Sequence, residues 1–149
     1  MDNSMIDADL PLCVFDNSYM VSALFSIYCD DEDTDALDYV EKIVNNNGQI
    51  YVPQLFWFEF WNVLVTSTKR KNNGNDPRIN QIQYSEIIQL IAKLPIYTDP
   101  QPDSETLQRI MAYAQEYGLS FYDATYLELA KRYNIPLKTF DEDLLKYSK

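Results

Sequence analysis

Short apolar runs alternate along the chain with longer segments in which apolar residues recur every three or four positions. The runs have the length of buried strands and lie at residues 12–15, 50–53, 94–98 and 135–139. The segments with helical spacing lie at about 17–28, 37–44, 54–67, 77–91, 107–117, 121–132 and 141–147. Strands that alternate with helices are typical of a parallel sheet covered by helices, so the sequence predicts an α/β fold.

Residues with strong local preferences mark several element ends. Pro53 closes the second strand and opens the helix at 54–67. Asp76 and Pro77 have the residue types of an N-cap and a first helical position, so they predict the start of the following helix. Gly118 is expected to close the helix that precedes it.

Length and apolar content indicate one domain. The chain has 149 residues, of which 46% are hydrophobic, and this is enough for a sizeable core. We expect the domain at 12–149 and a flexible extension at 1–11. The extension is acidic and lacks the basic start of a signal peptide, and no apolar run approaches the roughly 20 residues of a membrane span. We therefore expect a cytoplasmic protein.

The absence of histidine narrows the chemistry. With 0 His, the chain cannot use Ser-His-Asp or Cys-His nucleophile systems, and zinc sites of the Cys/His kind are not expected. Cys13 and Cys29 are predicted to be structural thiols. The net charge of −11 argues against an ordinary basic nucleic-acid-binding surface, but not against a nuclease whose acidic site is neutralised by cations. Catalysis must therefore rest on carboxylates, Lys, Tyr, Ser/Thr or a metal.

Three aspartates stand where either a ligand site or a helix cap would place them. Asp16 directly follows the first strand, and Asp141 follows the fourth. In open parallel sheets ligands bind beyond the carboxyl ends of the strands, so both carboxylates face one cleft if these strands are neighbours. Capping is the alternative, because Asp16 begins a helix and the segments SFYD (120–123, with Asp123) and TFDE (139–142) both fit a capping box.

Glu59 lies in the most apolar segment of the chain, QLFWFEFWNVL at 54–64. On a helical wheel Glu59 and Asn62 share a narrow strip, while aromatic and aliphatic residues fill the rest. A solvated strip is the simple interpretation. A helix this apolar is nevertheless expected to be enclosed on most sides, and a buried carboxylate then needs Lys, Arg, a hydroxyl or a bound cation as its partner.

With these acids and their neighbours, the chain resembles the PIN-domain ribonucleases, particularly the VapC-type toxins of bacterial toxin-antitoxin pairs. The likeness runs from about residue 12 to the C-terminus. It is carried by VFDNS (14–18), FEFWNVL (58–64), GLSFYDATYLELA (118–130) and PLKTFDEDL (136–144).

The resemblance implies a three-layer fold with a central parallel sheet of four or five strands. It also implies a divalent ion, Mg²⁺ or Mn²⁺, held directly or through water by Asp16, Glu59, Asp123 and Asp141. Hard cations prefer carboxylate oxygens, and a bound ion can activate water against a phosphodiester. Supporting roles fall to Ser18, Asn62 and Thr139, and to Asp143 as an alternative contributor beside Asp141.

Two further features concern partners. Trp57 and Trp61 lie one turn apart and are expected either in the core or against a second copy or an antitoxin. A basic cluster is expected either to contact RNA phosphates near the cleft or to form a solvated loop; it comprises Lys69, Arg70, Lys71 and Arg78.

Our leading hypothesis is a metal-dependent endoribonuclease that cuts structured RNA such as tRNA or rRNA. It would be the toxin of a toxin-antitoxin pair, and a homodimer. The first alternative is a weak or inactive protein of the same fold that acts as a protein- or RNA-binding module. A second alternative is phosphoryl transfer with Asp16 as nucleophile, which would need either a well-placed lysine or an aspartate where Ser18 stands.

Overall fold

Four parallel strands form the centre of the structure, a computed structural model that describes residues 10–30, 32–70, 74 and 76–148. Their order across the sheet is β3-β2-β1-β4. Leu12 of β1 pairs with Gln49 of β2, Ile50 of β2 with Ile96 of β3, and Val14 of β1 with Leu137 of β4. The strands are β1 (Leu12–Phe15), β2 (Gln49–Val52), β3 (Ile96–Thr98) and β4 (Leu137–Lys138).

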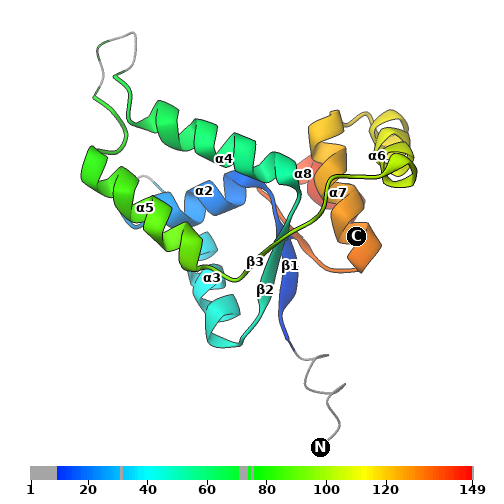
Figure 1. Ribbon diagram of the computed structural model, residues 1–149, viewed down its shortest axis with the longest axis horizontal. Helices are drawn as coiled ribbons and strands as arrows, with labels where there is room; N and C mark the ends of the chain where they lie inside the picture. Colours follow the sequence, from blue (N-terminus) through cyan, green and yellow to red (C-terminus); the bar gives the residue numbers. More distant parts are fainter. Residues whose placement is uncertain (1–9, 31, 71–73, 75, 149) are drawn as a thin grey trace, which may run out of the picture.

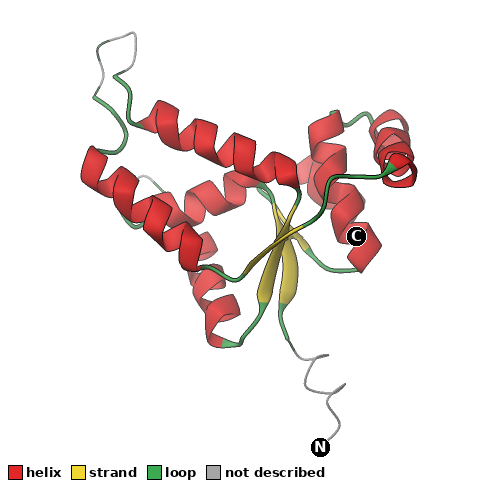
Figure 2. Ribbon diagram, in the orientation of Figure 1, coloured by secondary structure: helices red, strands yellow, loops and turns green. Residues whose placement is uncertain are grey.

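Helices cover both faces of this sheet, which gives the three layers of an α/β fold (Figure 1). In Figure 2, helices α2 to α5 lie on one side of the yellow strands and α6 to α8 lie on the other. Among them, α3 packs on β2, whereas α7 packs on β1 and β2 and is itself covered by α6 and α8. The helices are α2 (Asn17–Phe25), α3 (Asp35–Asn45), α4 (Gln54–Ser67), α5 (Gln81–Lys93), α6 (Ser104–Tyr117), α7 (Phe121–Tyr133) and α8 (Glu142–Ser148).

The core lies between the sheet and these helices. Cys13, Val14 and Phe15 of β1 are fully buried, as expected for a central strand covered on both faces. Helix α4 contributes Phe56, Phe60 and Leu64, which recur at intervals of four residues and form one buried stripe. The free thiol of Cys13 is therefore a core side chain, and Cys29 is partly buried and also free.

Several element ends match the sequence prediction. Strand β1 and helix α4 have the predicted bounds, and Gly118 closes α6 in the left-handed conformation with φ of 67°. Strands β3 and β4 are shorter than predicted. The expected extension falls largely on residues 1–9, which lie outside the described residues.

The prediction that Asp76 and Pro77 begin a helix is wrong. Helix α5 begins at Gln81, and Asn80 is its N-cap. The Gln83 backbone N–H donates to the Asn80 side chain over 2.8 Å, and the Asn80 N–H donates to the Gln83 side chain over 3.0 Å. This reciprocal capping box satisfies two backbone groups at the helix end, whereas the Asp-Pro pair satisfies none there.

Candidate metal-dependent active site

The end of β1 places Asp16 at the carboxyl edge of the sheet. Its side chain caps α2 by accepting the Tyr19 backbone N–H over 2.9 Å, and it accepts the Ser18 hydroxyl over 2.9 Å. The residue is only 8% exposed. From the sequence, Asp16 is either a helix cap or a ligand in the cleft. In the structure the same carboxylate can serve in both roles.

Strand β4 pairs with β1, so Thr139 and Asp141 arrive beside Asp16. Thr139 is buried, and its hydroxyl accepts the Asp141 backbone N–H over 3.0 Å. The Asp141 carboxylate accepts the Leu144 N–H over 3.1 Å at the start of α8. Asp141 is therefore the N-cap of α8. The predicted capping box from Thr139 to Glu142 is wrong.

Glu59 projects from α4 toward α7. Its Oε1 atom accepts the hydroxyl of Tyr126 over 2.6 Å, and Tyr126 is itself almost fully buried. Burial and the neighbouring Glu59 carboxylate raise the pKa of Tyr126, so this phenol stays protonated and remains a donor. The predicted requirement of a partner for Glu59 is met by a hydroxyl.

Asp123 lies in the first turn of α7, three residues before Tyr126. The Ser120 hydroxyl accepts the Asp123 backbone N–H over 3.0 Å, which makes Ser120 the N-cap of α7 and confirms one half of the predicted capping box. The Asp123 carboxylate itself stays half-buried and faces the charges of Asp16 and Asp141.

The acids share one electrostatic environment. Burial raises the pKa of Asp16, Glu59 and Asp123 above their ordinary values. Repulsion from Asp141 adds to the pKa of Asp16 and of Asp123, and repulsion from Asp16 and Asp123 adds to that of Glu59. Carboxyl groups with elevated pKa values that repel one another form a site that a cation stabilises.

The donor set suits a hard divalent ion. Within the described residues, no group of three carboxylates, thiols or imidazoles is close enough together to bind one ion directly. Mg²⁺ keeps several of its waters and is commonly held by only one or two carboxylates, so a hydrated ion does not require such a cluster. Direct sharing of one ion by Glu59, Asp16 and Asp123 stays a prediction.

The residue that follows Asp16 in the chain carries a buried oxygen that lacks a partner. The side-chain Oδ1 of Asn17 is buried and accepts no hydrogen bond from any described residue. Asn17 lines a hollow of about 320 Å³ together with Ser18 and Phe140. Buried acceptors are normally satisfied by protein or water, so this atom offers a place for a bound water in a hollow that none of the four acids lines. The fit to a hydrated ion rests on the carboxylates themselves.

The remaining predicted residues lie farther out or are engaged elsewhere. Asn62, Asp143, Lys69 and Arg70 are exposed, and Lys71 lies outside the described residues. Arg78 forms an ion pair with Glu32, and its guanidinium lies 4.7 Å from the centre of the Phe25 ring. RNA contact by this basic cluster stays a prediction, and Arg78 would have to share its charge with Glu32.

Two features were not foreseen from the sequence. The first is the Tyr126 hydroxyl, whose position three residues after Asp123 is the only local signal of its role. The second is Arg132, in the last turn of α7. Its guanidinium pairs with Asp99 over 2.7 Å and with Glu128 over 2.8 Å, and both acids are buried. The spacing of four residues between Glu128 and Arg132 was a usable signal for the second of these pairs.

With the acids placed at the carboxyl edge, comparison with known proteins identifies the family. Residues 15–149 match the family model described as the PIN domain, so the chain belongs to the PIN domain family. PIN domains are generally nucleases, that is, hydrolases of phosphodiester bonds. No curated protein matches the chain significantly.

Solved structures share the fold at low sequence identity. PAE2754 from Pyrobaculum aerophilum matches with a TM-score of 0.62 and 21% identity, over 94% of this chain and 81% of that one. A toxin-antitoxin complex from Klebsiella pneumoniae matches with a TM-score of 0.58 and 21% identity, over 88% of each chain. FitAcB from Neisseria gonorrhoeae matches with a TM-score of 0.60 and 11% identity, over 91% of this chain and 92% of that one.

Proposed function

We propose that the protein is a metal-dependent endoribonuclease that hydrolyses phosphodiester bonds in structured RNA such as tRNA or rRNA. The observation that carries this proposal is the placement of Asp16, Glu59, Asp123 and Asp141. The first and last follow neighbouring parallel strands, and all four belong to one electrostatic cluster with elevated pKa values for the three most enclosed acids. Membership of a family of nucleases supports the same reading.

These four carboxylates would hold Mg²⁺ or Mn²⁺, directly or through water. When bound, the ion lowers the pKa of a water molecule and stabilises negative charge on the phosphodiester. The chain's own part is orientation. Ser18 holds the Asp16 carboxylate by a hydrogen bond, and Tyr126 holds Glu59 in the same way. Because the free site retains protons more readily than isolated acids do, ion binding should release protons.

As to partners, we propose that the protein is a cytoplasmic toxin restrained by an antitoxin. A structure of similar fold is a toxin-antitoxin complex, which supports this assignment. Exposed apolar side chains on α4 offer a contact surface: Phe58 is 76% exposed, and Trp61 and Val65 are partly exposed. Trp57 is engaged within the chain, where its indole N–H donates to Thr98 over 2.9 Å. Either a second copy of the protein or an antitoxin would cover the exposed surface of α4.

Within the part of the chain that the structure describes, no helix is both long and apolar enough to cross a membrane.

The direct test is an RNA cleavage assay with purified protein. We expect cleavage of structured RNA in Mg²⁺ or Mn²⁺, and loss of cleavage when a chelator removes the ion. No cleavage of total tRNA or rRNA with either ion would contradict the proposal.

A second candidate function is a PIN-fold binding module without useful activity. The observations that favour it are that Asp16 and Asp141 already cap helices and that Arg78 is paired with Glu32. The net charge of −11 also disfavours tight RNA binding. Calorimetry separates the two functions: a nuclease binds Mn²⁺ at or below millimolar concentrations, whereas the module does not.

A further inference from the structure

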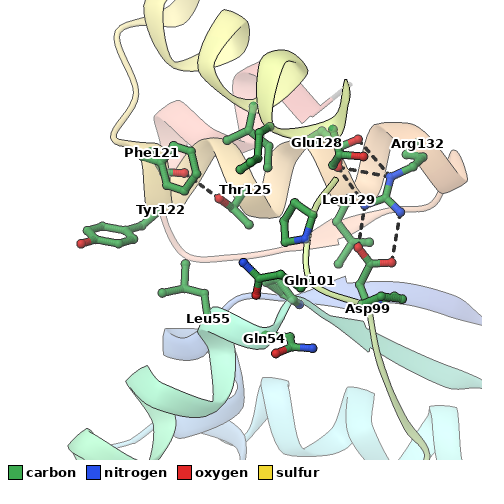
Figure 3. A pocket seen from close by; sticks show the side chains of 16 residues that line it. Gln54, Leu55, Asp99, Gln101, Phe121, Tyr122, Thr125, Glu128, Leu129 and Arg132 are labelled. Atoms are coloured by element: carbon green, nitrogen blue, oxygen red, sulfur yellow. Dashed lines mark hydrogen bonds and ion pairs between the residues drawn. The ribbon is translucent and has the colours of Figure 1, made fainter. Parts of the chain in front are cut away.

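A pocket lies between the start of α4, the segment after β3, the first half of α6 and one side of α7. Its volume is about 200 Å³. Figure 3 shows Gln54 and Leu55 of α4 on one wall, and Phe121, Thr125 and Leu129 of α7 across from them, with Gln101 between the two walls. Pockets for drug-sized ligands have about 300 Å³ or more, so this one suits a single ring system.

The pocket adjoins the acidic site along both helices. Leu55 comes four residues before Glu59 on α4, and Tyr122 comes four residues before Tyr126 on α7. Glu59 and Tyr126 are hydrogen-bonded to each other, whereas Leu55 and Tyr122 line the pocket. One helical turn is about 5.4 Å, which is comparable to one or two nucleotide steps of about 3.4 Å in a stacked strand.

The walls have the chemistry that binds flat, polar-edged rings. Phe121 is 43% exposed and Tyr122 is 59% exposed, and their rings meet edge to face with centroids 6.4 Å apart. Gln54 and Gln101 are exposed. Aromatic faces stack on nucleobases, and an amide can both donate to and accept from a base edge.

The charged residues that line one part of the pocket are paired with one another. The carboxylates of Glu128 and Asp99 both pair with Arg132, and Arg109 adds a contact to Glu128 over 3.3 Å. Arg109 also pairs with Glu105 over 3.3 Å, so three acids share two guanidinium groups. In a chain with a net charge of −11, the two guanidinium groups reduce the negative charge of this region without cancelling it.

We propose that this pocket binds one unpaired nucleobase of the RNA substrate, one or two nucleotides from the phosphate that is cut. The inference rests on the proposed nuclease function and adds a base-binding site to it. A side chain of a second protein is the competing occupant. The nucleobase is favoured because the walls pair aromatic faces with amide edges and because the acids that would hold the scissile phosphate lie one turn away.

Binding can be tested without cleavage. In a chelator, nuclear magnetic resonance titration with the four 5′-nucleoside monophosphates should shift the backbone amide signals of Gln101 and Phe121. Ribose 5-phosphate, which has no base, should leave them unchanged. Equal shifts from both probes, or none from either, would overturn the proposal. Signals that move only with protein concentration would assign the pocket to self-association and would overturn it as well.

Cleavage then tests the position of the base. An RNA oligonucleotide with a single abasic nucleotide next to the cut should be cleaved about 10-fold more slowly than the intact RNA, the scale of one stacked base. Phe121→Leu and Gln101→Ala should slow cleavage of the intact RNA and have no further effect on the abasic RNA. The matched control is Gln89→Ala, an exposed glutamine that lines a different hollow and should change neither rate.

The possible failures are distinguishable. If no RNA is cleaved by the parent protein, the nuclease function is contradicted, while the titration still decides base binding. If cleavage occurs but the abasic nucleotide and the two variants do not change the rate, or change it independently of one another, the base pocket is contradicted. The nuclease function then stands.

Discussion

The hydroxyl of Tyr126 donates a 2.6 Å hydrogen bond to the carboxylate of Glu59, and this bond joins α7 to α4 across the acidic site. The bond favours the ionised form of Glu59 and so lowers its pKa, against the upward effect of burial. It also fixes the direction in which that carboxylate points. Tyr126 is therefore a positioning residue for the acidic site.

Replacing Tyr126 by phenylalanine should weaken the site without dismantling the fold. Without its donor, the pKa of Glu59 rises further, so the acid-side limb of the cleavage rate should move to higher pH. A rate loss of about 10-fold near neutral pH and weaker Mn²⁺ binding should accompany it. Cleavage-rate profiles against pH and calorimetric titration measure the two effects.

The matched control is Tyr28→Phe. Tyr28 donates an equally short 2.6 Å hydrogen bond to Glu86, on an exposed surface away from the acids. Its removal should leave both the pH profile and ion binding unchanged. The positioning role would be contradicted if Tyr126→Phe lowered the rate by the same factor at every pH and left Mn²⁺ affinity intact.

Asp123→Asn should stabilise the metal-free protein at neutral pH. The folded-state pKa of Asp123 is raised by burial and then by Asp141 and Asp16. A raised carboxyl pKa adds stability below the unfolded pKa of about 3.9 and loses it as pH rises through the folded value. The amide avoids this loss.

Because Asp123 is only half-buried, solvent screening limits the gain to about 0.5 kcal/mol, or about 1–2 °C in melting temperature. Thermal unfolding in a chelator at pH 7 and pH 4 should show the difference shrinking at the lower pH. Mg²⁺ should raise the melting temperature of the parent more than that of the variant. A variant less stable than the parent at pH 7 would give Asp123 a structural role.

Arg132→Gln should destabilise the fold strongly. Glu128 is 2% exposed, and Asp99 is also buried, so losing the shared guanidinium leaves two enclosed carboxylates, of which only Glu128 keeps a contact to Arg109. Breaking such a buried pair from one side costs about 3–5 kcal/mol. Urea unfolding should show this loss, whereas Arg70→Gln should show no measurable change because the Arg70 to Asp76 pair is exposed and 3.9 Å apart. Equal stabilities of the two variants would contradict a structural role for the Arg132 pairs.

Gly48→Ala tests a close approach between two backbone segments. A Cβ atom at Gly48 would lie 2.2 Å from the Pro11 carbonyl oxygen and 2.6 Å from its ring, next to the start of β1 and β2. The two segments would have to separate, at a cost of roughly 1–3 kcal/mol. Denaturant unfolding measures this loss, and an unchanged midpoint would show that the approach is looser than described.

The sequence predicted those parts of the fold that depend on local patterns of residues. The apolar run of β1 and the aromatic segment of α4 gave correct bounds because each carries its own start and stop signals. The start of α5 was missed because the Asp76-Pro77 signal competed with Asn80 and Gln83, whose mutual capping satisfies more backbone groups.

The residues of the acidic site could be predicted from the sequence, but most contacts between their side chains could not. Asp16 and Asp141 could be placed together because parallel strands end at one edge of a sheet. The bond between Tyr126 and Glu59 joins residues 67 positions apart, and no periodicity along the chain encodes such a contact. The pairing of Arg132 with Asp99 was missed for the same reason, since the two residues are 33 positions apart.

The most direct test of the central claim is RNA cleavage by Asp16→Asn and Asp123→Asn in Mn²⁺, with Asp33→Asn as a matched acidic control on the loop before α3. Circular dichroism should first show that all three variants are folded. The account predicts a rate loss of at least about 100-fold for the first two variants and an unchanged rate for Asp33→Asn. Cleavage at the parent rate by folded Asp16→Asn and Asp123→Asn would contradict it.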